Sequence, residues 1–152
     1  MRQELQRRIS GKRVTMVGVG NPLRGDDGVG PALIDQLQGK VDAVLVDASD
    51  VPENYLGVVQ LSRPEVIVII DAVELDARAG DVALIELEQI GGTIATTHNT
   101  SLEPFAKMLR AETGADVLLV AIQPANRTFG APMSPAVVAT LEQLGKIFQG
   151  LA

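Results

Sequence analysis

The chain lacks cysteine and tryptophan, and aromatic residues make up only 3% of its 152 residues. Without cysteine it has no disulfide, no thiolate metal site and no cysteine nucleophile, as expected for a protein of a reducing cytosol. The scarcity of aromatic side chains argues against platforms on which nucleic acid bases stack. Basic residues are also in deficit, 13 lysines and arginines against 19 aspartates and glutamates, so the net charge is −6. Because there is no basic footprint, we expect no nucleic acid partner.

Long apolar segments are missing as well. The apolar run 66–70 is far too short to cross a bilayer, and the polar N-terminus leads to no apolar segment of a secretory signal. We therefore expect a cytoplasmic protein without membrane insertion, and a monomer by default. We also expect one domain over residues 1–152, with residues 1–12 as a polar N-terminal extension.

Five apolar runs rich in β-branched residues predict buried strands. They cover residues 13–19, 43–47, 66–71, 82–87 and 116–122. Amphipathic helical patterns lie between and after them, and one opens at Pro52 with Ser49 or Asp50 as its cap. This alternation predicts an α/β fold, a three-layer, doubly wound, five-stranded and mostly parallel sheet with helices on both faces. The connection 72–81 is too short for a crossover helix, so strand 82–87 is predicted to be antiparallel and at an edge.

Polar side chains gather where the predicted strands end. A glycine-rich segment, Gly18–Gly30, follows the first strand and carries Asp26 and Asp27. Asp71 ends the third strand, where an unpaired carboxylate is costly unless it is hydrogen-bonded or bound to a cation. His98, the only histidine, lies in the longest irregular segment. Each has a plain structural interpretation, in which Asp26 or Asp27 caps the next helix and His98 is a loop or capping residue.

Three of these residues together predict a cation site. In a doubly wound sheet the first and third strands are neighbours, so Asp27 and Asp71 are expected to face each other. Two close carboxylates repel, and a bound cation or a shared proton relieves the repulsion. His98 completes a set of two oxygens and one nitrogen, which suits nickel, zinc or iron(II) better than magnesium or calcium. Asp47 and Asp50, after the second strand, are interpreted as turn or cap residues.

Motifs of several other enzyme classes are absent. The sequence has no G-x-S-x-G nucleophile elbow and no H-E-x-x-H zinc motif. The segment Gly18–Gly30 lacks the third glycine of the dinucleotide fingerprint and the Lys-Ser/Thr of a P-loop. A plain nucleotide-binding domain therefore has only the glycines in its favour.

Several segments, in order, resemble the hydrogenase maturation endopeptidases. The stretch GVGNPLRGDDGVG over Gly18–Gly30 is similar to the opening motif of that family, G-x-G-N-x-x-x-x-D-[DE]-x-x-G. Ile69–Ala72 is similar to its strand-three acid. Two segments resemble the branch of the family that serves hydrogenase 3 of the formate hydrogenlyase type, Thr96–Asn99 and Ile122–Pro124. The segment Pro132–Pro135 also fits.

The resemblance implies an endopeptidase, aspartic-type or metal-assisted, that removes the C-terminal extension of the [NiFe] hydrogenase large-subunit precursor after nickel insertion. It carries the catalytic and metal-binding positions onto Asp27, Asp71 and His98, which would complete the coordination of the precursor's own nickel. Zn²⁺ or Cd²⁺ is expected to substitute for Ni²⁺. Asp26 is assigned a capping or supporting role and is also a candidate base, and Asn21 is expected to order the turn by hydrogen bonds to the backbone.

The alternative from a different class is a receiver-like phosphoacceptor signalling domain with a Mg²⁺-binding acidic pocket. Asp26, Asp27 and Asp71 meet its pattern of acids after the first strand and an aspartate that ends the third. Such a module needs a lysine at the end of the fifth strand, where this chain has Gln123 and Pro124. It requires neither the extra edge strand nor the histidine.

Overall fold

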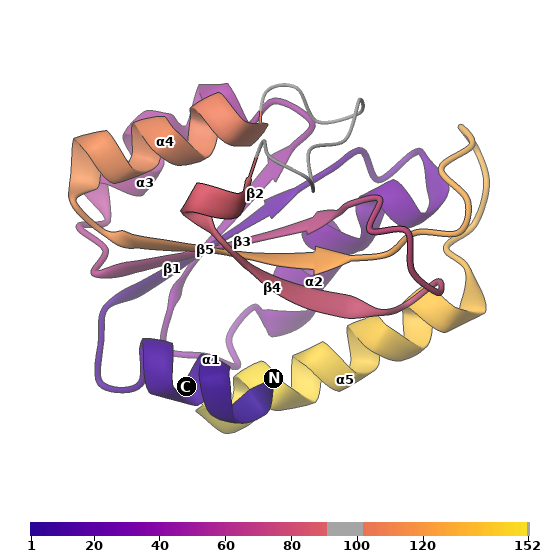
Figure 1. Ribbon diagram of the computed structural model, residues 1–152, viewed down its shortest axis with the longest axis horizontal. Helices are drawn as coiled ribbons and strands as arrows, with labels where there is room; N and C mark the ends of the chain where they lie inside the picture. Colours follow the sequence, from indigo (N-terminus) through magenta and orange to yellow (C-terminus); the bar gives the residue numbers. More distant parts are fainter. Residues whose placement is uncertain (91–101, 152) are drawn as a thin grey trace.

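A five-stranded sheet forms the centre of the computed structural model, which describes residues 1–90 and 102–151. Within these residues the strands lie in the order β2-β1-β3-β5-β4, as Figure 1 shows. Neighbours run parallel except β4, which pairs antiparallel with β5 at the edge. The predicted fold class and antiparallel edge strand are confirmed. The strand bounds are β1 Val14–Val19, β2 Val44–Ser49, β3 Val66–Ala72, β4 Val82–Glu86 and β5 Asp116–Ile122.

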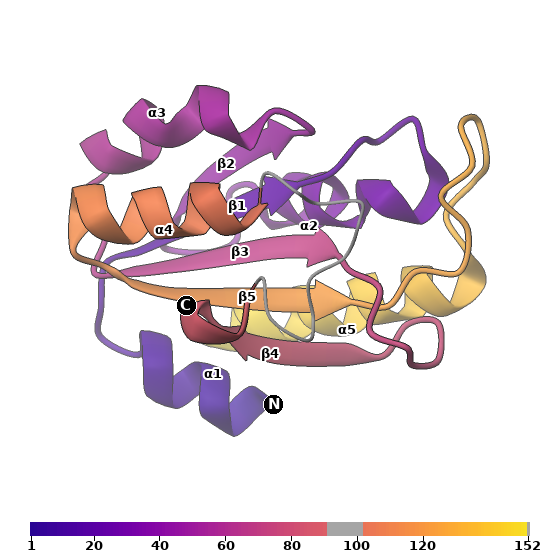
Figure 2. The same ribbon diagram turned by 45° about the horizontal axis from the view of Figure 1, so that its top comes forward.

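Helices cover both faces of the sheet and make the fold three-layered (Figures 1 and 2). On one face lie α3 (Leu56–Leu61) and α4 (Leu102–Thr113), and on the other lie α1 (Arg2–Ile9), α2 (Val29–Leu37) and α5 (Pro135–Leu151). Among the helices in the described ranges, none combines the length and apolarity needed to cross a bilayer. Short 3-10 turns occupy Gly25–Gly28, Pro52–Tyr55 and Leu87–Gln89.

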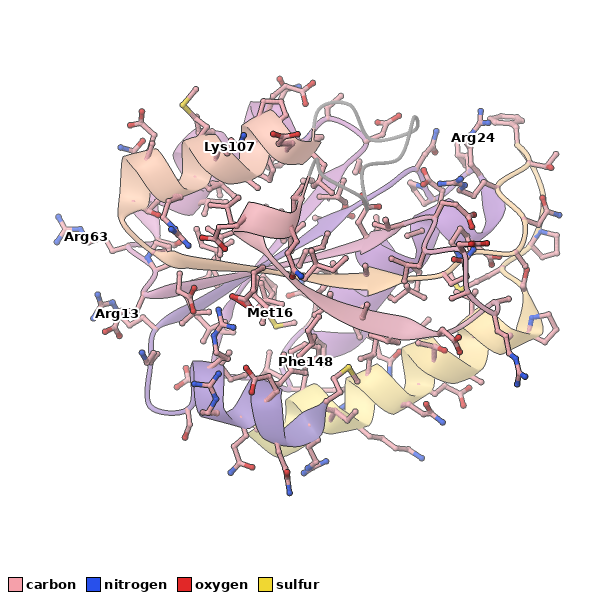
Figure 3. The ribbon with its side chains drawn as sticks, viewed as in Figure 1. Arg13, Met16, Arg24, Arg63, Lys107 and Phe148 are labelled. Carbon is pink, nitrogen blue, oxygen red and sulfur yellow. The ribbon has the colours of Figure 1, made fainter. Side chains whose placement is uncertain are left out.

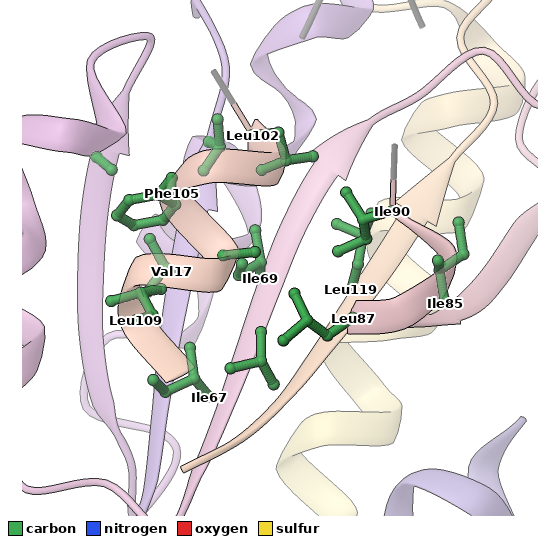
Figure 4. Packing of buried hydrophobic residues seen from close by; sticks show 14 of the residues in the cluster. Val17, Ile67, Ile69, Ile85, Leu87, Ile90, Leu102, Phe105, Leu109 and Leu119 are labelled. Carbon is green, nitrogen blue, oxygen red and sulfur yellow. The ribbon is translucent and has the colours of Figure 1, made fainter. Parts of the chain in front are cut away.

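The central strands are buried on both sides because their side chains alternate between two apolar layers. Met16 of β1 packs toward α5 in the layer that also contains Phe148 (Figure 3). Its neighbour Val17 belongs to the opposite layer, with Ile69 and with Phe105 of α4 (Figure 4). This continuous burial leaves the polar residues that end these strands at one edge of the core.

Residues 1–12 contain a helix, α1, that packs on the sheet. Its Leu5 and Ile9 are buried in the layer that holds α2 and α5. Arg8 lies 2.6 Å from a carboxylate oxygen of Glu86 on β4 and 2.6 Å from one of Asp116 on the neighbouring strand β5. Hydrogen bonds and opposite charge from these two acids raise the pKa of Arg8. The ion pairs therefore join the first helix to β4 and β5.

The helix caps differ from those predicted. The N-cap of α2 is Gly28, and no side chain bonds there, so neither Asp26 nor Asp27 caps the helix. The turn that opens at Pro52 has Val51 as its N-cap, so the predicted cap at Ser49 or Asp50 is wrong. Ser49 is instead the last residue of β2, where its carbonyl accepts the N–H of Gly20 at 2.6 Å.

Candidate functional site

Glycine at position 20 allows the first loop to approach the end of β3. Its φ of +137° disfavours other residues. A Cβ there would overlap the carbonyl oxygen of Asp27 and lie 3.7 Å from Oδ1 of Asp71. The Gly20 backbone thus fills the space between the two acids. This glycine is explained by close packing rather than by phosphate binding.

Asp71 is the penultimate residue of β3 and is fully buried. Its side chain is 0% exposed, and within the described residues neither Oδ1 nor Oδ2 has a hydrogen-bond partner. Burial and the nearby charge of Asp27 raise the pKa of Asp71 well above its ordinary value, while the Ala72 N–H and the charge of Arg127 oppose the rise. An acid in this state has unused acceptor capacity, since burial has removed its water.

Asp27 is held by the loop that carries it. Its Oδ2 accepts the backbone N–H of Asn21 at 2.8 Å, and its own N–H donates to the carbonyl of Arg24 at 3.0 Å. Asn21 in turn accepts the Leu23 N–H at 2.9 Å, which confirms that its side chain orders the turn. Since Asp27 is half-buried and accepts this one bond within the described residues, acceptor positions remain free for a ligand.

Asp26, the adjacent acid, has a different environment. It is 0% exposed and accepts the N–H groups of Ala125, Asn126 and Ser134 at 2.8, 2.9 and 2.6 Å, as well as the Ser134 hydroxyl at 2.8 Å. Burial pushes its pKa upward, but the bonds from Asn126, Ser134 and Ala125 outweigh burial and lower the pKa. Asp26 therefore fastens the first loop to the β5–α5 loop, and its acceptor capacity is used, which argues against a role as base.

Gln123 connects β5 to the segment between β3 and β4. Its Oε1 accepts the N–H of Leu75 at 2.7 Å, and its Nε2 donates to the carboxylate of Glu74 at 3.0 Å and to the carbonyl of Pro124 at 3.0 Å. The buried amide of Gln123 therefore occupies the position at the end of β5 where a receiver module has its lysine. Gln123, the residue that distinguishes this chain from a receiver module, connects two segments of the fold through its hydrogen bonds.

The structure brings together two of the three predicted site residues. His98 lies outside the described residues, so nothing here places it. Within residues 1–90 and 102–151 no cluster of three potential ligands is present. Asp27 and Asp71 are near enough for the charge of Asp27 to raise the pKa of Asp71. Asp47 is an exposed residue of strand β2 rather than the turn or cap residue that was expected, and its Oδ1 accepts the Ser49 N–H at 3.0 Å.

The environments of two residues at this end of the sheet, Ser134 and Arg127, were not predicted from the sequence. Ser134 was noted only as part of a proline-flanked segment, yet it gives Asp26 two hydrogen bonds. Arg127 belongs to no motif, and its Nη1 is buried without a partner among the described residues. No periodicity or spacing signals either role, because both depend on which loops meet after the sheet has formed.

Similar proteins support one family. The family model described as hydrogenase maturation protease matches residues 30–149. The hydrogenase 3 maturation protease of Escherichia coli strain K12 is 30% identical over 135 residues, which cover 87% of this chain and 86% of that protein. A putative hydrogenase maturation protease of Methanocaldococcus jannaschii is 27% identical over 143 residues, 88% of this chain and 84% of that protein.

A solved structure agrees in fold over nearly the whole chain. The crystal structure of a [NiFe] hydrogenase maturation protease, HycI from Thermococcus kodakarensis KOD1, matches with a TM-score of 0.89 at 26% identity, covering 97% of each chain. The fold agrees over nearly the whole chain, and the family model match includes Asp71. The chain belongs to the hydrogenase maturation protease family and is a peptidase.

Proposed function

We propose that this protease removes the C-terminal extension of a [NiFe] hydrogenase large-subunit precursor once nickel is inserted. In this proposal Asp27, Asp71 and His98 bind that nickel as part of the substrate. The observation that carries the proposal is the state of Asp71, which is 0% exposed and has no hydrogen bond to either oxygen within the described residues. Burying a lone carboxylate is costly, and a bound cation offsets this cost.

The chemistry of the donor set supports nickel as that cation. Two carboxylates and one imidazole suit a borderline divalent ion, and three ligands leave positions open for groups of the precursor. A cation so placed is able to polarise the scissile carbonyl or to acidify a bound water. Asp27 accepts one hydrogen bond from Asn21, at 2.8 Å, which orients its carboxylate while leaving lone pairs free.

Processing of a nickel-loaded precursor by site variants tests the assignment. We expect Asp27→Ala and His98→Ala to lose cleavage, measured as the shift of the precursor to its mature size on a denaturing gel. Asp47→Ala is the matched control, because Asp47 is an exposed acid at the end of the neighbouring strand β2. Wild-type cleavage rates in both site variants would overturn the metal-site assignment.

The role of nickel has its own test. The protein is mixed with precursor that either carries nickel or has been prepared without it, and cleavage is followed over time. We expect cleavage of the loaded precursor alone. Equal cleavage of both, in the presence of a chelator, would contradict nickel recognition and favour an aspartic-type mechanism in which the two carboxylates share a proton.

A further inference from the structure

Arg127 lies on the β5–α5 loop and differs in exposure from its neighbours. The flanking residues 125–126 and 128–130 are exposed, whereas Arg127 is half-buried. Its Nη1 is buried and has no hydrogen-bond partner among the described residues. A buried guanidinium N–H without an acceptor is costly, so this donor requires an explanation.

The same end of the sheet holds unpartnered acceptors. Both oxygens of Asp71 are buried and without hydrogen bonds in the described part of the chain. The charge of Arg127 acts on Asp71 and opposes the rise in its pKa, although within the described residues the two form no ion pair. A buried donor and two buried acceptors are thus within electrostatic range of each other without being paired.

A ligand that satisfies both sides must bring two kinds of group. Toward Asp71 and Asp27 it must present a cation, because two carboxylates repel an anion and each other. Toward Arg127 it must present an oxygen acceptor, because a guanidinium has only donors. A cation with a peptide carbonyl beside it meets both demands.

The loop around Arg127 is fixed on both sides. Asp26 accepts the N–H groups of the two preceding residues, Ala125 and Asn126, at 2.8 and 2.9 Å. After it, the Gly130 N–H donates to the carbonyl of Leu23 at 2.8 Å, on the loop that carries Asp27. These bonds fix the backbone on both sides of Arg127, and a side chain on a fixed backbone needs less rearrangement when charge develops on a reacting oxygen.

We infer that Arg127 is a substrate-binding residue, whose guanidinium donates a hydrogen bond to the acyl oxygen of the scissile peptide. The inference rests on the proposed function. In the cut, the oxygen of water bonds to the acyl carbon and the peptide C–N bond breaks. The acyl carbon keeps the water oxygen as a carboxylate, and both water protons end on the leaving amine, which departs as ammonium. Arg127 stabilises the oxyanion that forms between these events.

Cleavage kinetics with Arg127→Met, Arg127→Lys and a control variant test the inference. Arg24→Met is the control, because Arg24 is an exposed arginine on the adjoining loop (Figure 3). We expect Arg127→Met to lower kcat on nickel-loaded precursor by about 100-fold or more with KM little changed, as for the loss of one oxyanion donor. Lysine, which lacks the planar fork, should restore only part of the rate. Added guanidinium ion at millimolar concentration should partly rescue Arg127→Met but not a variant with a damaged fold.

Two further outcomes decide against the inference. A kcat for Arg127→Met within about threefold of that of Arg24→Met would overturn it. Titration of Ni²⁺ into the free proteins separates binding from positioning. Arg127→Met should bind Ni²⁺ as tightly as wild type or more tightly, because a like charge is removed. A loss of Ni²⁺ binding equal to that of Asp71→Asn would mean that Arg127 only positions Asp71.

Failure of this inference is distinguishable from failure of the proposed function. If Asp71→Asn is inactive while Arg127→Met is normal, the metal site stands and the role of Arg127 falls. If Asp71→Asn cleaves as wild type does, the proposed nickel site falls, and the role of Arg127 falls with it.

Discussion

Asp26 and Asp71 are both fully buried aspartates at the carboxyl end of the sheet, yet their surroundings are opposite. Asp26 accepts four hydrogen bonds from the β5–α5 loop. Asp71 accepts none from a described residue within hydrogen-bonding geometry. Bonding lowers the pKa of Asp26 against the effect of burial, whereas burial and the charge of Asp27 raise that of Asp71.

This difference separates an acid that builds the site from an acid that is available to a ligand. Asp26 stabilises two loops, because buried carboxylates gain most from several charge-assisted hydrogen bonds. Asp71 costs stability in the absence of a cation, and a group with such a cost is a candidate for function. Neighbouring acids in the sequence, Asp26 and Asp27, fall on different sides of this division. The four predictions below sharpen or break it.

The largest effect is expected for Asp71→Asn. Loss of a ligand should lower the rate of nickel-dependent processing by more than about 100-fold, since even supporting partners of metal ligands cost 10- to 100-fold. The free energy of unfolding at neutral pH should be equal to that of the wild type or higher, because a buried ionisable group is replaced by a neutral amide. Gel-based processing and urea unfolding measure the two quantities. A rate within about tenfold of wild type would place Asp71 among the structural acids.

The reverse pattern is expected for Asp26→Asn. The amide turns an N–H₂ group toward backbone N–H donors, so the free energy of unfolding should fall by about 2–4 kcal/mol. Urea unfolding monitored by circular dichroism measures this change. At a temperature where the variant remains folded, processing should persist at a reduced rate. A variant as stable as wild type would contradict the role of Asp26 in holding the first loop to the β5–α5 loop.

The pH dependence of stability should have opposite signs at the two sites. The pKa of Asp26 is lowered below 3.8, so its contribution is present above about pH 4 and is lost as the pH falls through the lowered pKa. The stability gap between wild type and Asp26→Asn should therefore close in acid. The pKa of Asp71 is raised above 3.8, so wild type should lose stability relative to Asp71→Asn as the pH rises above about 4. Unfolding curves of wild type and both variants from pH 3 to 7, with a chelator present, measure the two stability differences. If both differences changed with pH in the same direction, the contrast between Asp26 and Asp71 would be wrong.

The smallest effect is expected for Ser134→Ala. It removes one of the four bonds to Asp26, the hydroxyl donor at 2.8 Å, and leaves the Ser134 N–H bond in place. The free energy of unfolding should fall by about 1 kcal/mol with processing nearly unchanged. Thermal unfolding and the gel assay test this together. A loss of processing without a loss of stability would assign Ser134 a role at the site itself.

Some features of the site could be predicted because they follow from local pattern. The run Val66–Ile70 predicts a buried strand, and the acid that ends it, Asp71, was identified as costly to bury. Asn21 was expected to order its turn, and it does so through the Leu23 N–H. Such features need only the chain direction and the period of side chains along a strand.

Other features could not be predicted from the same pattern. The helix cap expected from Asp26 or Asp27 was wrong, because the partners of Asp26 are donors about 100 residues away in the sequence. From the sequence spacing, helix capping and ligand binding were equally good interpretations of Asp26 and Asp27. The contact between the two loops in the folded protein distinguishes them. Arg127 was missed for the same reason.

The sequence by itself determined the alternation of strands and helices, the antiparallel edge strand and the family, since hydrophobic periodicity and short motifs are local properties of the chain. Only the tertiary structure decided which acid is satisfied and which is left without partners. Hydrogen bonding and burial are properties of neighbours in space. The adjacent residues Asp26 and Asp27 therefore have identical chemistry in the sequence and different roles in the fold.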